Sequence, residues 1–144
     1  MFNSEIALKV TMAVWTRDKM YYYRQREGST FGGGKSNNIR SFMYAQKYVH
    51  QMFLNQSADF VKRYTAYTLN RMADAWSKSW INHFSDEKEV RATFTDYYDR
   101  YHSLIRGTRE EKNIFFARHV KNIYLLYKKI KARRQGLLKD GYIM

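Results

Sequence analysis

The sequence predicts an all-α fold, a single-domain bundle of about five helices with no β-sheet. Apolar residues recur with helical spacing along most of the chain, whereas the alternation typical of strands is nowhere sustained. The chain contains no proline, the residue that most strongly disrupts helix interiors. Its 144 residues, 44% of them hydrophobic, are enough to enclose one core of ordinary size.

The N-terminal part predicts one helix and one joint. Helical spacing runs from about Ser4 to Glu27, and a glycine-rich joint then occupies residues 28–36. Glycine loses too much conformational entropy to persist inside a helix, so we interpret this stretch as a connection between helices. One alternative is a joint whose backbone N–H groups, with Lys35 and Arg40, hold one phosphate of a nucleic-acid backbone. Another is a nucleotide-binding phosphate loop. Against it, Gly28 lies one position too early for that motif, and a helix precedes it where a strand is required.

Two further helices are expected after the joint. Cap-type side chains at Ser36–Asn38 predict the start of the second helix. Asn55–Ser57 marks a weak break, after which a third helix runs to about Phe84. Because the break has no proline, these two helices can also be continuous. Trp76 and Trp80 are four residues apart on the third helix, and we expect both in the core.

The C-terminal half predicts two more helices and a tail. Ser85, followed by two acidic residues, predicts the start of the fourth helix, and Gly107 predicts its end. Thr108–Glu111 has the spacing of a capping box and opens a fifth helix, which we expect to continue to about Gln135. Residues 137–144 are expected to form a short C-terminal tail, either docked on the bundle or frayed.

The fifth helix is the strongest functional signal. The chain carries 26 Lys and Arg against 13 Asp and Glu, a formal net charge of +13, and no acidic residue lies between Lys112 and Leu138. On a helical wheel, the basic residues gather opposite an apolar face, which we expect to pack inward. Five residues form that apolar face: Phe116, Val120, Ile123, Tyr127 and Ile130.

Positive charge along one helix requires a partner. Like charges repel, so a helix of one sign over six turns is unfavourable unless an anionic surface meets it. We expect a nucleic acid or an acidic protein surface. A membrane surface is a third alternative, although the apolar face is needed to close the core. We expect no membrane-spanning segment and no signal peptide, which is compatible with the cytoplasm or a virion.

A run of tyrosines near the N-terminus is a second candidate surface. Tyr21, Tyr22 and Tyr23 are consecutive and are followed by Arg24 and Arg26. Three neighbours span about 200° of a helix, so they cannot all face one core. An exposed ring can stack on nucleic-acid bases or enter a protein interface. The third interpretation is three partly buried rings whose hydroxyls reach solvent.

Few residues are suited to catalysis or metal binding. The absence of cysteine excludes disulfides, thiolate metal sites and a cysteine nucleophile. The four histidines are not spaced to present a two-histidine metal site on a helix, so we expect no metal and no cofactor. Asp96, Asp99 and His102 are spaced for proton transfer, but such pairs are common on helix surfaces, and we expect no enzymatic activity.

Two functions follow from these features of the sequence. The first hypothesis is a non-enzymatic protein of a nucleoprotein assembly, which contacts the backbone of DNA or RNA without reading bases. Its phosphate contacts would be these side chains: Arg118, Lys121, Lys128, Lys129, Lys131, Arg133, Arg134, Lys35, Arg40, Arg24 and Arg26. The second hypothesis is a structural or adaptor subunit of a virion, ribosome-like particle or organellar complex, whose basic helix docks an acidic protein neighbour. A homo-oligomer is compatible with both.

Overall fold

The computed structural model describes residues 9, 36–136, 138–139 and 142–143, and this part of the chain is mostly helical. The helix expected over 4–27 and residues 28–35 of the expected joint lie outside it. A four-residue 3₁₀-helix, η1 (His102–Ile105), follows directly after Tyr101, the last residue of an α-helix. The α-helices are α2 (Ser36–Phe53), α3 (Ala58–Ile81), α4 (Glu87–Tyr101), α5 (Glu111–His119) and α6 (Lys121–Arg134). The predicted all-α bundle is confirmed.

The C-terminal residues form the only paired strands in the described part of the chain. β1 (Leu138–Lys139) and β2 (Tyr142–Ile143) are antiparallel, with Leu138 opposite Ile143. β1 contacts α6 and β2 contacts α3, so these residues of the expected tail are docked on the bundle. The sequence predicts no sheet, so this short strand pair is an exception to the prediction, while residues 36–136 contain no strand.

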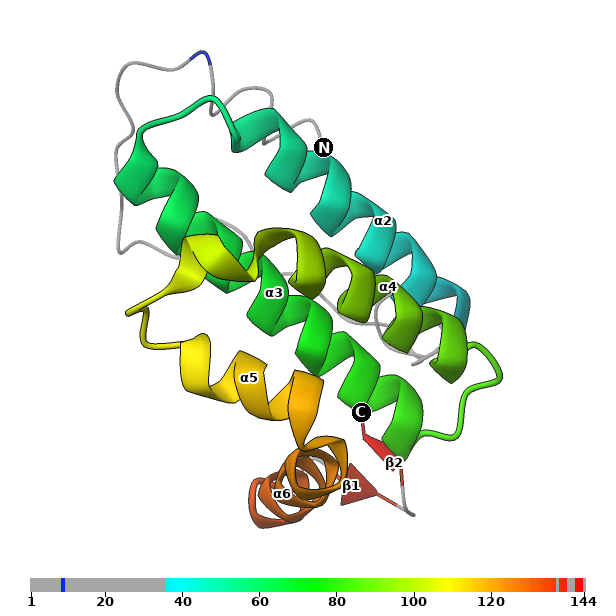
Figure 1. The fold of residues 1–144 in the computed structure, drawn as a ribbon. Coiled ribbons are helices and arrows are strands. Elements are labelled where there is room, and N and C mark those ends of the chain that lie inside the picture. The colour runs from blue at the N-terminus through cyan, green and yellow to red at the C-terminus, as the bar shows by residue number, and fades with distance from the viewer. Residues whose placement is uncertain (1–8, 10–35, 137, 140–141, 144) are drawn as a thin grey trace, which may run out of the picture.

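Helix α3 is the centre of the bundle. In Figure 1, α2, α3 and α4 run side by side diagonally across the view, and α5 and α6 lie below α3. α3 contacts all four of the other α-helices. Its sequence explains this position, because many of its buried residues are small and allow neighbouring helices to approach closely. These small buried residues are Thr65, Ala66, Thr68, Ala73, Ala75, Ser77 and Ser79.

Stacked aromatic rings occupy the middle of the core. Trp76 of α3 stacks against Phe94 of α4 and against Tyr124 of α6, with ring centroids 6.0 Å apart in both pairs. The indole N–H of Trp76 donates a hydrogen bond to the Glu87 carboxylate at 2.6 Å. All three rings are almost completely buried. Trp76 therefore joins α4 and α6 to α3, and its predicted place in the core is confirmed.

The predicted start of α2 and the break before α3 are both confirmed. α2 begins at Ser36, and the chain leaves helical conformation between Phe53 and Ala58, so α2 and α3 are separate helices. Ser57 occupies the N-cap position of α3, but its side chain makes no cap hydrogen bond. Its backbone carbonyl instead accepts a hydrogen bond from the N–H of Val61 at 2.9 Å.

The predicted end of α3 is wrong. The helix ends at Ile81 rather than at Phe84, and His83 adopts a left-handed backbone conformation with φ of 53°. Trp80, expected in the core, is 36% exposed. Four residues advance about 40° beyond one full turn of helix, so Trp80 is rotated away from the side on which Trp76 is buried.

The predicted cap of α4 is also wrong. α4 begins at Glu87, with Asp86 rather than Ser85 in the N-cap position, and Asp86 makes no side-chain cap hydrogen bond. The Asp86 carboxylate instead accepts a hydrogen bond from the hydroxyl of Ser79 at 3.2 Å. Asp86 is buried, so a contact with α3 takes the place of the local cap.

Gly107 ends the segment formed by α4 and η1, as predicted. Its φ of 76° lies in the left-handed region, which glycine adopts at little cost. The predicted capping box does not form. The Glu111 carboxylate accepts a hydrogen bond from the N–H of Gly107 at 2.6 Å rather than from that of Thr108, and the Thr108 hydroxyl donates to the carbonyl of Ile105 at 2.8 Å. α5 therefore begins at Glu111 rather than at Thr108.

The predicted continuous fifth helix is wrong, because a bend at Val120 divides it into α5 and α6. Val120 has φ of −124° and ψ of 54°. Its N–H still donates to Phe116 and its carbonyl still accepts from Tyr124, so the bend is confined to one residue. Both helices contact α3, and Figure 1 shows α6 nearly end-on beneath α5. Packing on α3, rather than a proline or glycine, accounts for the bend.

Candidate functional site

The basic side chains expected to contact an anionic partner divide into two groups. Arg118 and Lys128 belong to the first group, because each is held by a carboxylate of the bundle. Both guanidinium bonds from Arg118 to Asp99 measure 3.1 Å, and this hydrogen bonding lowers the pKa of the Asp99 carboxyl. Lys128 forms an ion pair with Asp74 of α3, and its side chain is only 16% exposed. Neither cation is free for an outside anion.

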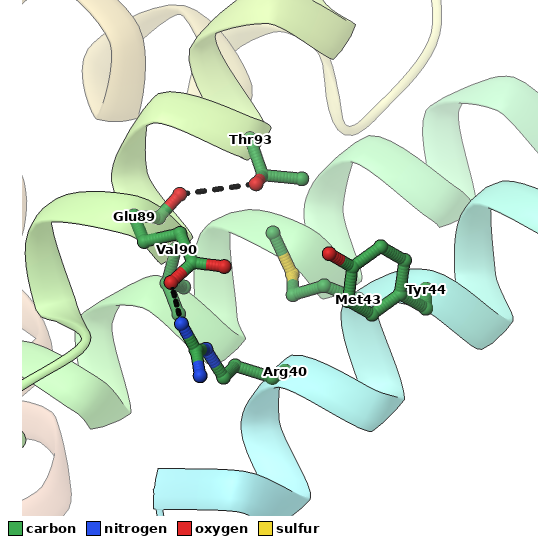
Figure 2. A pocket seen from close by; sticks show the side chains of 6 residues that line it. All are labelled: Arg40, Met43, Tyr44, Glu89, Val90 and Thr93. Atoms are coloured by element: carbon green, nitrogen blue, oxygen red, sulfur yellow. Dashed lines mark hydrogen bonds and ion pairs between the residues drawn. The ribbon is translucent and has the colours of Figure 1, made fainter.

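Arg40 is also engaged within the molecule. Its guanidinium forms an ion pair with Glu89 of α4, which Figure 2 shows, and it lies 3.9 Å from the Asp86 carboxylate. The hydrogen bond to Glu89 raises the pKa of Arg40. The cavity beside this pair has a volume of about 10 Å³, room for one water molecule. Arg40 therefore joins α2 to α4 and forms no ligand pocket.

The second group of cations faces solvent on α6. Lys121, Lys131, Arg133 and Arg134 are exposed, and Lys129 is half-buried. None of the five makes an ion pair with any residue that the structure describes. These are the only expected phosphate contacts that the described structure leaves available. The remaining ones, Lys35, Arg24 and Arg26, and the stacking candidates Tyr21, Tyr22 and Tyr23, lie outside the described residues.

The orientation of α6 is the opposite of the prediction. Three side chains of α6 expected to pack inward face solvent instead, since Ile123 is 61%, Tyr127 52% and Ile130 43% exposed. Phe116 of α5, expected on the same inward face, is 46% exposed. The buried residues of the two helices lie on the other side: Ile114, Ala117, Tyr124, Leu125 and Ala132.

A carboxylate on α3 explains why α6 packs this way. Asp74 accepts a hydrogen bond from the Tyr124 hydroxyl at 3.3 Å and also pairs with Lys128. The Lys128 ammonium lies 5.3 Å from the centroid of the Tyr124 ring, a cation–π contact. Burial raises the pKa of Tyr124, whose neutral hydroxyl donates to Asp74. Turning the apolar side inward would leave the part-buried Asp74 without these partners.

Large apolar side chains therefore gather on the outer side of α5 and α6. In addition to the four already named, Phe115 is 48% and Leu126 is 58% exposed. We define the α6 stripe as Ile123, Leu126, Tyr127 and Ile130. The sequence pattern did not indicate Phe115 or Leu126 as part of an exposed surface. The small residues Ala117 and Ala132, at positions that face the bundle, are the signal that could have indicated the buried side.

A groove lies between α5 and α6. It has a volume of about 320 Å³ and is lined by Asn113 and Phe116 of α5 and by Ile123, Tyr124 and Tyr127 of α6. The Asn113 side-chain amide is hydrogen-bonded to Asn70 of α3, and Tyr124 is fixed by the core. Two of its lining residues are therefore held in place without a ligand.

The candidate acid–base residues do not form a shared site. Asp96 pairs with Arg100 at 3.3 Å, and Asp99 pairs with Arg118. The Nδ1 atom of His102 lies 3.2 Å from the backbone carbonyl of Asp99. Over the described residues, no group of three or more His, Asp or Glu side chains is arranged to hold a metal ion.

Comparison with known proteins finds no matching family, no matching curated sequence and no matching solved structure. No helix in the described part of the chain combines the length and the apolar character that crossing a membrane requires.

Proposed function

We propose that this protein is a non-enzymatic adaptor or structural subunit that docks an acidic protein surface through α5 and α6. The observation that supports the proposal most strongly is that the outer side of α6 carries both large apolar side chains and cations that form no ion pair with any described residue. Protein interfaces combine an apolar or aromatic centre with a charged rim, and this surface has both parts. A cluster of large apolar side chains that are each 43–61% exposed, as on α5 and α6, is otherwise unfavourable in water.

Arginine and tyrosine at this surface suit the same function. Tyr127 lies within the α6 stripe, and Arg133 and Arg134 follow it at the end of the helix. Tyr and Arg are enriched among residues that dominate binding energy, because each combines a large contact area with hydrogen bonding. An acidic partner on this side of α6 would meet four cations, Lys129, Lys131, Arg133 and Arg134, that form no ion pair with a carboxylate of the described chain.

Association with nucleic acid is the second candidate function. It is favoured by the exposed cations Lys121, Lys131, Arg133 and Arg134, which lie in a segment without an acidic residue. Phosphates would pair with these cations but would not cover the apolar stripe between them, because nucleic-acid interfaces are more polar than protein interfaces. We therefore favour an acidic protein surface over nucleic acid as the partner of α6.

Purification from the natural source with and without nuclease separates the two functions. A protein partner remains bound after nuclease treatment, whereas nucleic acid and anything that it bridges are released. Leu126→Ser should abolish retention of the protein partner, while Leu104→Ser, at a 41% exposed residue of η1, should not. Release of all bound material by nuclease, together with equal behaviour of the two variants, would refute the docking function and favour nucleic acid.

A further inference from the structure

The groove between α5 and α6 is large enough to receive a large apolar side chain. Its volume of about 320 Å³ exceeds what water alone requires, and Phe116, Ile123 and Tyr127 make its walls apolar. Tyr124 is 2% exposed and hydrogen-bonded to Asp74. A preformed concave site of this kind binds a protruding apolar side chain without first having to become ordered.

The α6 stripe extends this groove along the helix. Ile123, Leu126, Tyr127 and Ile130 occupy positions i, i+3, i+4 and i+7, which lie on one side of a helix. That spacing is the one at which a second helix packs, because its own side chains enter between successive turns. The stripe therefore matches a helical partner better than an extended strand, which would need an unpaired sheet edge.

Charge determines the kind of helix that fits. At 100° per residue, Lys129 and Arg133 lie on one side of the stripe, Lys131 lies on the other, and Arg134 continues it. A partner helix with carboxylates on both sides of its apolar ridge would meet these cations across the contact. Such a helix is acidic and amphipathic.

The same charges argue against two other occupants. A second copy of this chain would bring an identical basic helix against α6, and like charges across an interface are unfavourable. Residues 1–35 contain six Lys and Arg against three Asp and Glu, a net charge of +3, so this segment is not acidic either. A lipid surface could satisfy the cations but, being broad and flat, would leave the groove unfilled.

We propose that α5 and α6 bind an acidic amphipathic helix of a partner protein, and that the groove receives one large apolar side chain from it. This proposal rests on the docking function proposed above and adds the secondary structure, the charge and the anchor of the partner. Phe116 and Tyr127 would contact the anchor, while the cations beside the stripe would align the helix.

Two synthetic peptides test the proposal with the full chain. The first is a helix of about 18 residues with leucines at i, i+3, i+4 and i+7 and glutamates on both sides of them. The second has the same composition, with the leucines distributed around the helix. We expect the first to bind at least about tenfold more tightly by fluorescence anisotropy. Tyr127→Ala and Phe116→Ala should each remove most of that difference.

Matched controls separate binding from folding. Tyr44→Ala removes a 65% exposed tyrosine from α2, outside the groove, and should leave peptide affinity unchanged. Far-ultraviolet circular dichroism of each variant checks that helix content is retained. Equal loss of affinity in Tyr44→Ala and Tyr127→Ala would show that the groove is not the binding site and would overturn the proposal.

The remaining outcomes distinguish this proposal from the docking function. Equal binding of both peptides would overturn the helix and its anchor but would leave docking of an acidic surface intact. Binding to neither peptide, with binding to vesicles of about 30% phosphatidylserine that Tyr127→Ala weakens, would replace the protein partner with a membrane. Binding to no peptide and no vesicle would refute the helical partner, and the purification with and without nuclease would then decide the docking function separately.

Discussion

His50 makes the stability of this protein depend on pH in a defined direction. The side chain is 1% exposed, and its two ring nitrogens each lie 2.7 Å from a hydroxyl oxygen, Nδ1 from Tyr97 and Nε2 from Thr65. The rings of Tyr64 and Tyr101 also pack against it. A neutral imidazole satisfies both contacts, because one nitrogen donates and the other accepts. Burial lowers the pKa of His50 from 6.5 to about 4.

The sign of the effect follows from this lowered pKa. Below pH 6.5 the unfolded chain binds a proton at His50 that the folded chain does not bind until the pH approaches 4, so the free energy of unfolding falls over this interval. Each unit of pKa difference corresponds to about 1.4 kcal/mol, so the complete loss is about 3 kcal/mol. Between about pH 7.5 and pH 5, the part contributed by His50 is about 2 kcal/mol.

Chemical denaturation of the wild type and of His50→Gln measures this contribution. Glutamine does not titrate, so the wild type should lose about 2 kcal/mol more than the variant when the pH is lowered from about 7.5 to 5. Carboxylates that titrate in the same range affect both chains and cancel in the difference. Nuclear magnetic resonance titration of the His50 ring in the wild type gives its pKa directly, even where the variant is too unstable to compare.

Two results would refute the reasoning about His50. Parallel loss of stability in the wild type and His50→Gln would mean that His50 takes up the same protons in both states. A ring pKa near 6.5 in the folded protein would mean that solvent reaches the imidazole, contrary to its burial between α2, α3 and α4.

Three further predictions concern stability. Gly107→Ala places a side chain at φ of 76° and should destabilise the fold by about 1 to 2 kcal/mol in urea denaturation, and an unchanged midpoint would show that this turn is not left-handed. Trp76→Ala should cost about 3 to 5 kcal/mol and Trp80→Ala less than half as much, and equal costs would contradict the different burial of these two residues on α3. A double-mutant cycle with Lys128→Met and Asp74→Asn should give a coupling of about 1 kcal/mol after allowance for partial solvent screening, whereas a coupling of zero would argue that α6 is turned the other way.

The sequence by itself determined the helical class and several helix boundaries. The start of α2 at Ser36, the break before α3 and the end of the α4–η1 segment at Gly107 depend on local backbone preferences. Those preferences can be read from the residue types at each boundary. The concentration of positive charge after Lys112 is likewise a property of the chain and needs no structure to be seen. Predictions of helix caps were less reliable where a residue of another helix forms a hydrogen bond with the side chain in the cap position. Asp86, for example, bonds to Ser79 instead of capping α4.

Only the tertiary structure decided which side of the last two helices faces the core. Helical spacing identifies an apolar side but does not say whether it packs inward, and the larger apolar side of α6 faces out. The inward side is selected by Asp74 on α3, which bonds to Tyr124 and Lys128 from some 50 residues earlier in the chain. Such a long-range polar contact leaves no periodic trace in the sequence, because each partner is an ordinary residue in its own helix. With the apolar stripe outward, Asp74 keeps both of its described partners, Tyr124 and Lys128.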